Sequence, residues 1–150
     1  MVKYKYIIYI LMIEISSEVD LANIVKHDPR ILIIFFSTSY CTSCNLLTPK
    51  LADLERKYSN EILVIKVDGQ KASNLFRNYF IDQIPTIVFY QNKFLFKQYR
   101  LVGPNIDTIE NVVNIIQSRY NKKVNDLQNV KPPNPGDIYN FNRGQVRWTS

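Results

Sequence analysis

The only two cysteines of the chain stand three positions apart, in Tyr40-Cys41-Thr42-Ser43-Cys44. A Cys at the first turn of a helix meets unpaired backbone N–H groups and the positive end of the helix dipole, and both stabilise a thiolate. The pKa of Cys41 should therefore fall below about 8.5, the value of a free thiol, which makes its sulfur a nucleophile near neutral pH. A second Cys one turn further on can displace a partner from a mixed disulfide and close a ring. This spacing indicates thiol–disulfide exchange.

The segments on either side of the pair predict the elements that this chemistry needs. The apolar run 31–36 reads Ile-Leu-Ile-Ile-Phe-Phe and predicts a strand buried on both faces. After the pair, Leu47, Leu51 and Leu54 form a stripe suited to an amphipathic helix. Pro49 falls inside that helix, where the missing N–H should produce a kink. The cysteines thus lie where a buried strand ends and a helix begins.

Two other uses of the cysteine pair stay open. A structural zinc site usually needs four N or S ligands, and besides the two cysteines the chain offers only His27. Zinc would then require carboxylate ligands or a metal shared within a dimer. A purely structural disulfide is the second alternative, although closing so short a loop removes little chain entropy. We expect His27 to be solvated between a helix and a strand, and we expect neither a metal nor an organic cofactor.

The rest of the pattern predicts an α/β domain. Strands and helices alternate at first, which is typical of parallel βαβ units, and two strands near the end form a hairpin. The predicted elements are a first strand over 6–15, a helix capped by Ser16 or Ser17 and ended by Asp28-Pro29, a strand over 61–68, a helix over 72–79, strands over 86–90 and 94–102, and a helix that begins with a capping box at Asp107. Helices are available to cover both faces of one mixed sheet.

The N-terminal segment has two interpretations. Lys3 and Lys5 precede an apolar run over 6–13, which is far shorter than the roughly 20 residues that span a bilayer. A charged start and an apolar core are typical of a signal peptide, but no small-x-small cleavage site follows. We therefore expect a first strand and a cytoplasmic location, with the secretory pathway as the alternative.

The C-terminal segment changes character. We expect a domain over 1–119 and a Pro/Asn-rich, irregular tail over 120–150, because Pro-rich sequence holds neither a helix nor a central strand. The chain carries a formal net charge of +6, and residues 121–150 hold five Lys and Arg against two Asp and Glu. The sequence has neither a Lys/Arg cluster nor an aromatic–basic face, so it does not indicate nucleic acid as a partner.

Several features resemble the thioredoxin family over residues 12–119, in the same order and spacing. Tyr40 to Cys44 resembles the family's Trp-Cys-Gly-Pro-Cys redox motif, and Pro49 falls where the family kinks its active-site helix. Ile84-Pro85-Thr86 resembles the family's Ile-Pro-Thr, whose proline is cis and lies beside the redox cysteines. Gly103 matches the glycine after the last strand. The resemblance implies a thioredoxin-like three-layer α/β/α sandwich with a mixed central sheet, followed here by an irregular tail.

The same resemblance implies a protein-disulfide oxidoreductase. Cys41 would attack a substrate disulfide and Cys44 would resolve the mixed disulfide. Tyr40, which replaces the family's Trp, would form the substrate-binding surface with Ile84 and Pro85, and Ile84 would pair its backbone with an extended substrate. The implied partners are protein disulfides and a reductase or an oxidase, and we expect a monomer without a membrane span. A disulfide oxidase or isomerase in protein folding, and a non-catalytic binding module, are the alternatives.

Three departures from the family concern the chemistry itself. Phe35 stands six residues before the first Cys, where the family places a buried acid that helps move the proton of the resolving Cys. Cys44 would then lose its proton to water, to the substrate or to another group. Lys66 aligns with the lysine that partners this acid, and we expect it to point outward. Thr42 and Ser43 replace Gly-Pro, and hydroxyls that stabilise the thiolate make a disulfide more oxidising.

Overall fold

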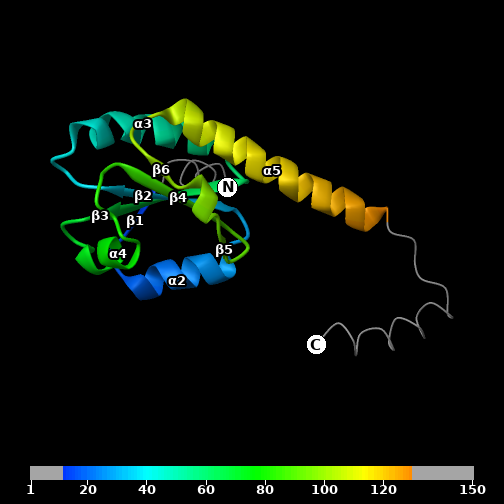
Figure 1. Cartoon of the computed structure of the whole chain (residues 1–150), viewed down its shortest axis with the longest axis horizontal. Coiled ribbons are helices and arrows are strands. Elements are labelled where there is room, and N and C mark those ends of the chain that lie inside the picture. The colour runs from blue at the N-terminus through cyan, green and yellow to red at the C-terminus, as the bar shows by residue number, and fades with distance from the viewer. Residues whose placement is uncertain (1–11, 130–150) are drawn as a thin grey trace, which may run out of the picture. The chain divides into compact units, whose positions relative to one another are not determined.

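The computed structural model describes residues 12–129, and these contain one six-stranded sheet with helices on both of its faces (Figure 1). In chain order the elements are β1 (Ile13–Ile15), α2 (Glu18–His27), β2 (Ile31–Ser37), α3 (Thr42–Lys57), β3 (Ile62–Asp68), α4 (Ser73–Asn78), β4 (Thr86–Gln91), β5 (Phe94–Leu95), the 3-10 helix η1 (Lys97–Tyr99), β6 (Leu101–Val102) and α5 (Ile106–Gln128). The alternation of strands and helices predicted up to β4 is confirmed.

The sheet is mixed, as predicted. Its strand order is β1-β3-β2-β4-β5, and β6 pairs with β4 as well. β1, β3 and β2 run parallel, and β4 runs antiparallel to β2. β2 lies at the centre of the sheet and all seven of its residues are buried, which is the reason for its unbroken apolar sequence. The predicted α/β/α sandwich with a mixed central sheet is therefore confirmed.

Two hydrophobic cores lie on opposite faces of the sheet. Alternate residues of β2 serve the two cores, because successive side chains of a strand point to opposite faces. Ile33 and Phe35 contribute to the core that α3 and α5 cover, whereas Ile34 and Phe36 contribute to the core that α2 and α4 cover. Figure 1 shows these two pairs of helices on either side of the strands. Each fully buried aliphatic or aromatic side chain of this kind stabilises the fold by about 1.5–3 kcal/mol.

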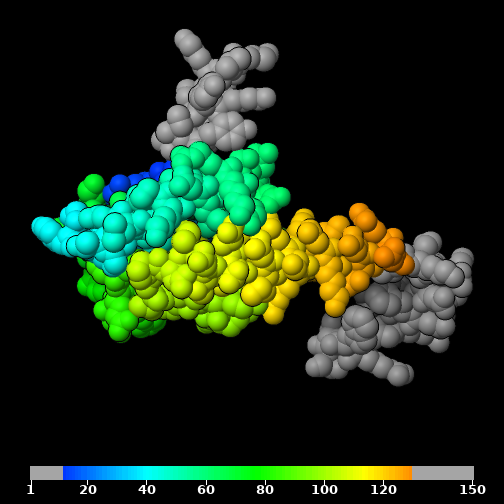
Figure 2. All heavy atoms as spheres, turned by 90° about the horizontal axis from the view of Figure 1, so that it is seen from above, coloured from blue at the N-terminus to red at the C-terminus, as the bar shows by residue number. Residues whose placement is uncertain are grey.

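The helices α3 and α5 pack against each other as well as against the sheet. Figure 2 looks onto this face and shows α3 and the first turns of α5 side by side. The Nζ of Lys57 lies 2.7 Å from an Oε of Glu110, and the hydroxyl of Tyr58 donates a hydrogen bond to Asn114 over 3.0 Å. These contacts join the end of α3 to the start of α5, so the helix that carries the cysteines is held at both its sheet face and its side.

Two helix starts can be compared with the predictions. Ser17 caps α2, because its Oγ accepts hydrogen bonds from the N–H groups of Val19 and Asp20 at 3.2 and 3.4 Å. The predicted capping box at Asp107 is wrong. Asn105 caps α5 instead, since its Oδ1 accepts a hydrogen bond from the N–H of Thr108 at 3.2 Å. Asn is among the most favourable N-cap residues, and the helix begins one residue after it.

The predicted strand over 94–102 is interrupted. Leu95 pairs with Tyr90 and Leu101 pairs with Ile87, so the partner segment advances six residues while β4 advances three. The three extra residues are accommodated by η1, which separates β5 from β6. The polar run Lys97-Gln98-Tyr99-Arg100 lacks the alternation of a half-buried strand, which is consistent with this bulge.

The last helix is longer than predicted. The irregular tail was expected from residue 120, but α5 continues to Gln128. No Pro or Gly occurs between Gln117 and Gln128, so nothing in this stretch breaks a helix, and the first prolines follow only at 132 and 133. Most of the described side chains from Gln117 to Asn129 are exposed. The remainder of the predicted tail, 130–150, lies outside the described residues.

The predicted first strand falls only partly on described residues. β1 covers Ile13–Ile15, where it pairs with β3, while residues 6–11 of the predicted strand lie outside the described part of the chain. Among the helices within 12–129, none combines the length and the apolar character that crossing a membrane requires.

Candidate active site

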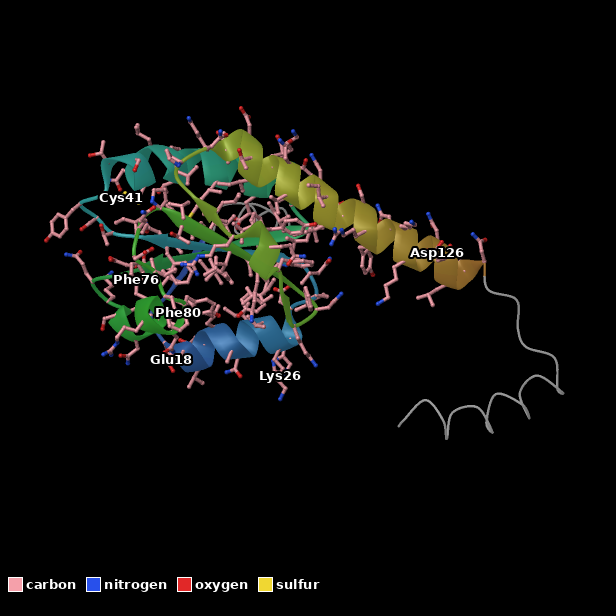
Figure 3. The ribbon with its side chains drawn as sticks, in the orientation of Figure 1. Glu18, Lys26, Cys41, Phe76, Phe80 and Asp126 are labelled. Carbon is pink, nitrogen blue, oxygen red and sulfur yellow. A yellow bond between two sulfur atoms is a disulfide. The ribbon has the colours of Figure 1, made fainter. Side chains whose placement is uncertain are left out.

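Cys41 and Cys44 form a disulfide at the start of α3, with their Cα atoms 5.1 Å apart. Cys41, which is labelled in Figure 3, is the N-cap of the helix. Cys44 lies in the first turn, as the sequence predicts. The chain reaches this point directly from the end of β2, and the N–H of Cys41 donates a hydrogen bond to the carbonyl of Thr38 over 3.3 Å. A central buried strand therefore anchors the segment that carries the cysteines.

The surroundings of the two sulfur atoms differ. Cys41 is partly exposed, whereas Cys44 is only 1% exposed and belongs to the core beneath α3. The Sγ of Cys41 accepts a hydrogen bond from the N–H of Cys44 at 3.1 Å and lies 3.4 Å from the Oγ of Ser43. The first turn of α3 contains no acidic residue that would oppose a negative charge. These donors and the helix dipole stabilise a thiolate on Cys41, the sulfur that an incoming group reaches first.

No acid lies beside Cys44 in the strand beneath it. Phe35 is fully buried in the same core as Cys44 and fills the place where the family has a carboxylate. Lys66 pairs in register with Phe35 across β2 and β3, is partly exposed, and forms no salt bridge with any residue of 12–129. The proton of Cys44 has no carboxylate acceptor at this position.

Sequence reasoning missed a buried acid elsewhere on α3. Glu55 is 8% exposed, and its Oε2 accepts a hydrogen bond from the backbone N–H of Val64 at 2.7 Å. It follows Cys44 by eleven residues, which corresponds to about 16 Å along the helix, so it does not replace the missing acid. The signal was present in the sequence, because Glu55 follows Leu51 by four residues and so falls on the apolar stripe.

The predicted substrate-binding residues lie at the end of the sheet where the disulfide is. The peptide bond between Ile84 and Pro85 is cis, as the resemblance implies. Thr86 pairs with Phe36 near the end of β2, which places Pro85 next to the segment that leads to Cys41. Ile84 packs against the core that contains Cys44, and Pro85 is buried.

Gly103 follows β6 and contacts Pro85 through the backbone. Its N–H donates a hydrogen bond to the carbonyl of Pro85 over 2.9 Å, and its φ of +107° is a conformation that suits glycine.

Tyr40 precedes the disulfide and is 82% exposed, so its ring is available to a partner rather than to the core.

The metal alternative can be compared with the structure. Across residues 12–129, no three His, Cys, Asp or Glu side chains come together in a way that could hold a metal ion. His27 is exposed at the end of α2, and its Nδ1 lies 2.9 Å from the carbonyl of Asn23 in the same helix. Its side chain is solvated, as expected. Among the described residues, it forms no hydrogen bond with either cysteine.

The chain is similar to thioredoxins over most of its length. The family model described as Thioredoxin matches residues 13–126. Thioredoxin of Coprinus comatus is 30% identical over 103 residues, which cover 68% of this chain and 95% of that protein. Thioredoxin-T of Drosophila melanogaster is 24% identical over 115 residues, which cover 77% of this chain and 71% of that protein. Thioredoxin 2 of Plasmodium falciparum is 26% identical over 74 residues. The chain spans about half of that protein, 47% of its length.

Solved structures show the same fold. Mitochondrial thioredoxin 3 of Saccharomyces cerevisiae in its oxidized form superposes with a TM-score of 0.64 at 20% identity, over 71% of this chain and 97% of that one. Thioredoxin of Trypanosoma brucei brucei superposes with a TM-score of 0.65 at 16% identity, over 73% and 94% of the two chains. The chain therefore belongs to the thioredoxin family, and its bonded Cys41–Cys44 pair is the redox centre of a protein-disulfide oxidoreductase.

Proposed function

We propose that this protein reduces or exchanges disulfides of protein substrates, with Cys41 as the nucleophile and Cys44 as the resolving thiol. The observation that carries the proposal is the difference between the two sulfur atoms. Cys41 is partly exposed at the N-cap of α3 and accepts a backbone N–H, whereas Cys44 is buried. A substrate sulfur therefore meets Cys41 first, and Cys44 is shielded from substrates until a mixed disulfide forms beside it.

The reaction begins with both thiols reduced. The Cys41 thiolate attacks one sulfur of the substrate disulfide, so a Cys41–substrate bond forms and the other substrate sulfur leaves as a thiolate. Cys44 then loses its proton and attacks the Sγ of Cys41, which forms the bond seen here and releases the second substrate sulfur. The substrate gains two electrons and two protons, and the cysteine pair loses them. A reductase partner that supplies two electrons and two protons would restore the dithiol.

Binding of the substrate chain is assigned to Tyr40, Ile84 and Pro85. Neither the N–H nor the C=O of Ile84 takes part in a backbone hydrogen bond with another described residue outside the regular elements. An extended substrate could pair with these groups as an added strand. The exposed ring of Tyr40 offers an apolar contact on the N-terminal side of the disulfide.

The second step depends on how Cys44 loses its proton. Phe35 stands where the family has a buried acid, so no carboxylate is available there. We infer that the departing substrate thiolate or water accepts this proton. Resolution of the mixed disulfide should then be slower than in relatives that retain the acid. It should also accelerate with pH more steeply, because no protein carboxylate mediates the transfer.

A disulfide oxidase or isomerase is the second candidate, and one observation favours it. The hydroxyl of Ser43 lies 3.4 Å from the Sγ of Cys41, where it can stabilise a thiolate and so make the disulfide more oxidising. Equilibration with glutathione buffers separates the two candidates, because an oxidase requires a markedly higher reduction potential than a reductase. A cytoplasmic location belongs to the reductase proposal, and the secretory pathway belongs to the oxidase.

Reduction of insulin disulfides tests the proposal. We expect the wild-type protein, kept reduced by dithiothreitol, to precipitate insulin faster than dithiothreitol alone. Cys41→Ser should lose this acceleration because it lacks the nucleophile. Lys123→Gln, a substitution on an exposed residue of α5, should keep the wild-type rate. If the wild type did not accelerate the reaction, the binding-module alternative would take its place.

A further inference from the structure

A cavity of about 1030 Å³ lies on the face of the sheet opposite the disulfide helix. It opens between α2, the end of α4 and the segment that runs from β5 to Arg100. Its apolar lining comes from Leu21 and Val25 of α2, Leu75 of α4, and Val88 and Leu95 of the sheet. A pocket of this size, with an apolar lining and a few polar groups, is typical of sites that take up a small molecule.

The rim of the cavity is cationic. Lys26, Lys93, Lys97 and Arg100 line it, and Glu18 is the only acid among the lining residues. The three lysines form no salt bridge with any residue between 12 and 129. Figure 3 marks Glu18 and Lys26 on α2, and the carboxylate of Glu18 already accepts a hydrogen bond from Asn78 at 2.7 Å. The rim therefore carries an excess of positive charge, with four cationic side chains against one carboxylate.

A pair of phenols supplies a hydrogen-bond donor inside the cavity. The hydroxyls of Tyr79 and Tyr90, which both line the cavity, lie 2.6 Å apart. One hydroxyl donates its proton to the other, so the second proton remains available to another acceptor. An ordinary tyrosine hydroxyl keeps its proton at neutral pH, and burial raises the pKa of Tyr79 further. The pair is therefore suited to an acceptor group that enters from the rim.

Phe80 forms an exposed lip of the same cavity. It follows α4 with a φ of +53°, and the bonds from Phe80 N to Arg77 O and from Ile81 N to Phe76 O form a Schellman motif. This position usually holds glycine, because a side chain in the left-handed region costs about 1–2 kcal/mol. Nevertheless the ring is 83% exposed and gains little from burial within the protein. An aromatic ring held there at such a cost is a candidate contact for something outside the chain.

We propose that this cavity binds an amphipathic carboxylate, that is, a fatty-acid-like molecule with one anionic head and an apolar chain. The chain would lie on the aliphatic lining and against Phe80, and the head would meet the lysines of the rim and the free phenol proton. A neutral apolar molecule would leave the cations unused, and a polyanion such as nucleic acid would leave the apolar lining unused. The site lies across the sheet from Cys41, so it does not depend on the disulfide chemistry.

Dodecanoate, used below its micelle-forming concentration, is the probe for this site. We expect saturable binding by isothermal titration calorimetry, and clearly weaker binding of dodecanol, which has the same chain without the charge. The double variant Lys93→Gln/Lys97→Gln should bind dodecanoate about fivefold to tenfold more weakly, since two partly screened charge contacts are lost. The matched control Lys122→Gln/Lys123→Gln removes two exposed lysines that do not line the cavity, and it should bind like the wild type.

Filling the cavity provides a second variant. Ala22 is an exposed residue of α2 that lines the cavity, so Ala22→Phe should block the site at little cost to folding. We expect it to lose dodecanoate binding while it keeps the thermal unfolding midpoint and the insulin reduction of the wild type. A Cys41→Ser/Cys44→Ser variant should bind dodecanoate normally, which separates this site from the redox centre.

Three outcomes would overturn the proposal. The first is no saturable binding of dodecanoate by the folded wild type. The second is equal affinity for dodecanoate and dodecanol together with no effect of the lysine substitutions, which would show an uncharged apolar contact. The third is binding only to vesicles of anionic phospholipid, or only to an acidic peptide, without binding of the monomeric carboxylate. The third outcome would assign the rim to a surface role rather than to a pocket for a small molecule.

Discussion

The buried carboxylate of Glu55, on α3, accepts a hydrogen bond from the backbone N–H of Val64, on β3, over 2.7 Å. Val64 precedes Ile65, the first residue of β3 that pairs with β1. The N–H of Val64 thus has a partner in a side chain from the helix. Glu55 joins the helix that carries the disulfide to the sheet beneath it, at the end of the helix away from the cysteines.

Glu55→Gln tests this contact through its pH dependence. Burial raises the pKa of Glu55, and this outweighs the opposing effects of the Val64 hydrogen bond and of Arg30. A carboxyl whose pKa is higher in the folded state favours folding at low pH, and that contribution is lost as pH rises through the folded pKa. Gln keeps an acceptor and carries no charge. The stability of Glu55→Gln relative to the wild type should therefore increase from pH 4 to pH 7, as measured by urea unfolding.

Glu55→Ala is the control for the hydrogen bond itself. It leaves the N–H of Val64 buried without an acceptor, so it should destabilise the protein by about 1–3 kcal/mol at both pH values. A difference between Glu55→Gln and the wild type that stayed constant from pH 4 to pH 7 would contradict the raised pKa.

Gly69→Ala tests a close approach in the loop after β3. An added Cβ would lie 2.7 and 2.8 Å from the ring of Phe76 and 3.2 Å from the Cγ2 of Thr38. The ring of Phe76 packs edge-on against Phe36 with centroids 5.4 Å apart, so it cannot move freely. We expect Gly69→Ala to destabilise the fold by about 1–3 kcal/mol in thermal or urea unfolding.

Phe76→Leu provides the matched background for this prediction. The shorter side chain removes the ring atoms that the new Cβ meets, so Gly69→Ala should cost less in that background than in the wild type. Equal costs in the two backgrounds would show that the contact with Phe76 is not what excludes alanine.

Phe80→Asn tests the strain at the end of α4. Asn adopts positive φ more readily than Phe, and the exposed ring of Phe80 loses almost no buried area. We expect the variant to be more stable than the wild type by about 0.5–1 kcal/mol and, at the same time, to bind dodecanoate more weakly. Phe94→Asn, at an exposed aromatic residue of β5, should give no gain in stability. A loss of stability in Phe80→Asn would mean that the ring serves the fold instead of a ligand.

The central elements could be predicted because their signals are local. The unbroken apolar run of β2 and the Leu47, Leu51 and Leu54 stripe specify a buried strand and an amphipathic helix wherever they occur. The cis Ile84–Pro85 bond, by contrast, was expected only through the resemblance of Ile-Pro-Thr to the family motif. No rule of composition or periodicity identifies it.

Other features depend on contacts between distant parts of the chain. The insertion of η1 arises from the register that β4 imposes on two short strands, which no local pattern records. The apolar stripe places Glu55 on the buried face of α3, but its acceptor role becomes evident only when the fold brings Val64 opposite it. The cavity is formed by residues from α2, α4 and the β4–β6 segment, so its cationic rim becomes visible only when the three lysines are placed together. The sequence did not predict the extension of α5 to Gln128, because its polar composition is typical of irregular segments as well as of an exposed helix.

Capture of the mixed disulfide is the most direct test of the central claim that Cys41 attacks and Cys44 resolves. The reduced Cys44→Ser and Cys41→Ser variants are each mixed with a disulfide-containing protein such as insulin, quenched with acid and analysed by non-reducing gel and mass spectrometry. We predict that Cys44→Ser accumulates a covalent adduct through Cys41 and that Cys41→Ser accumulates little, because Cys44 is 1% exposed. Adducts in equal amounts from both variants, or from neither, would contradict the assignment.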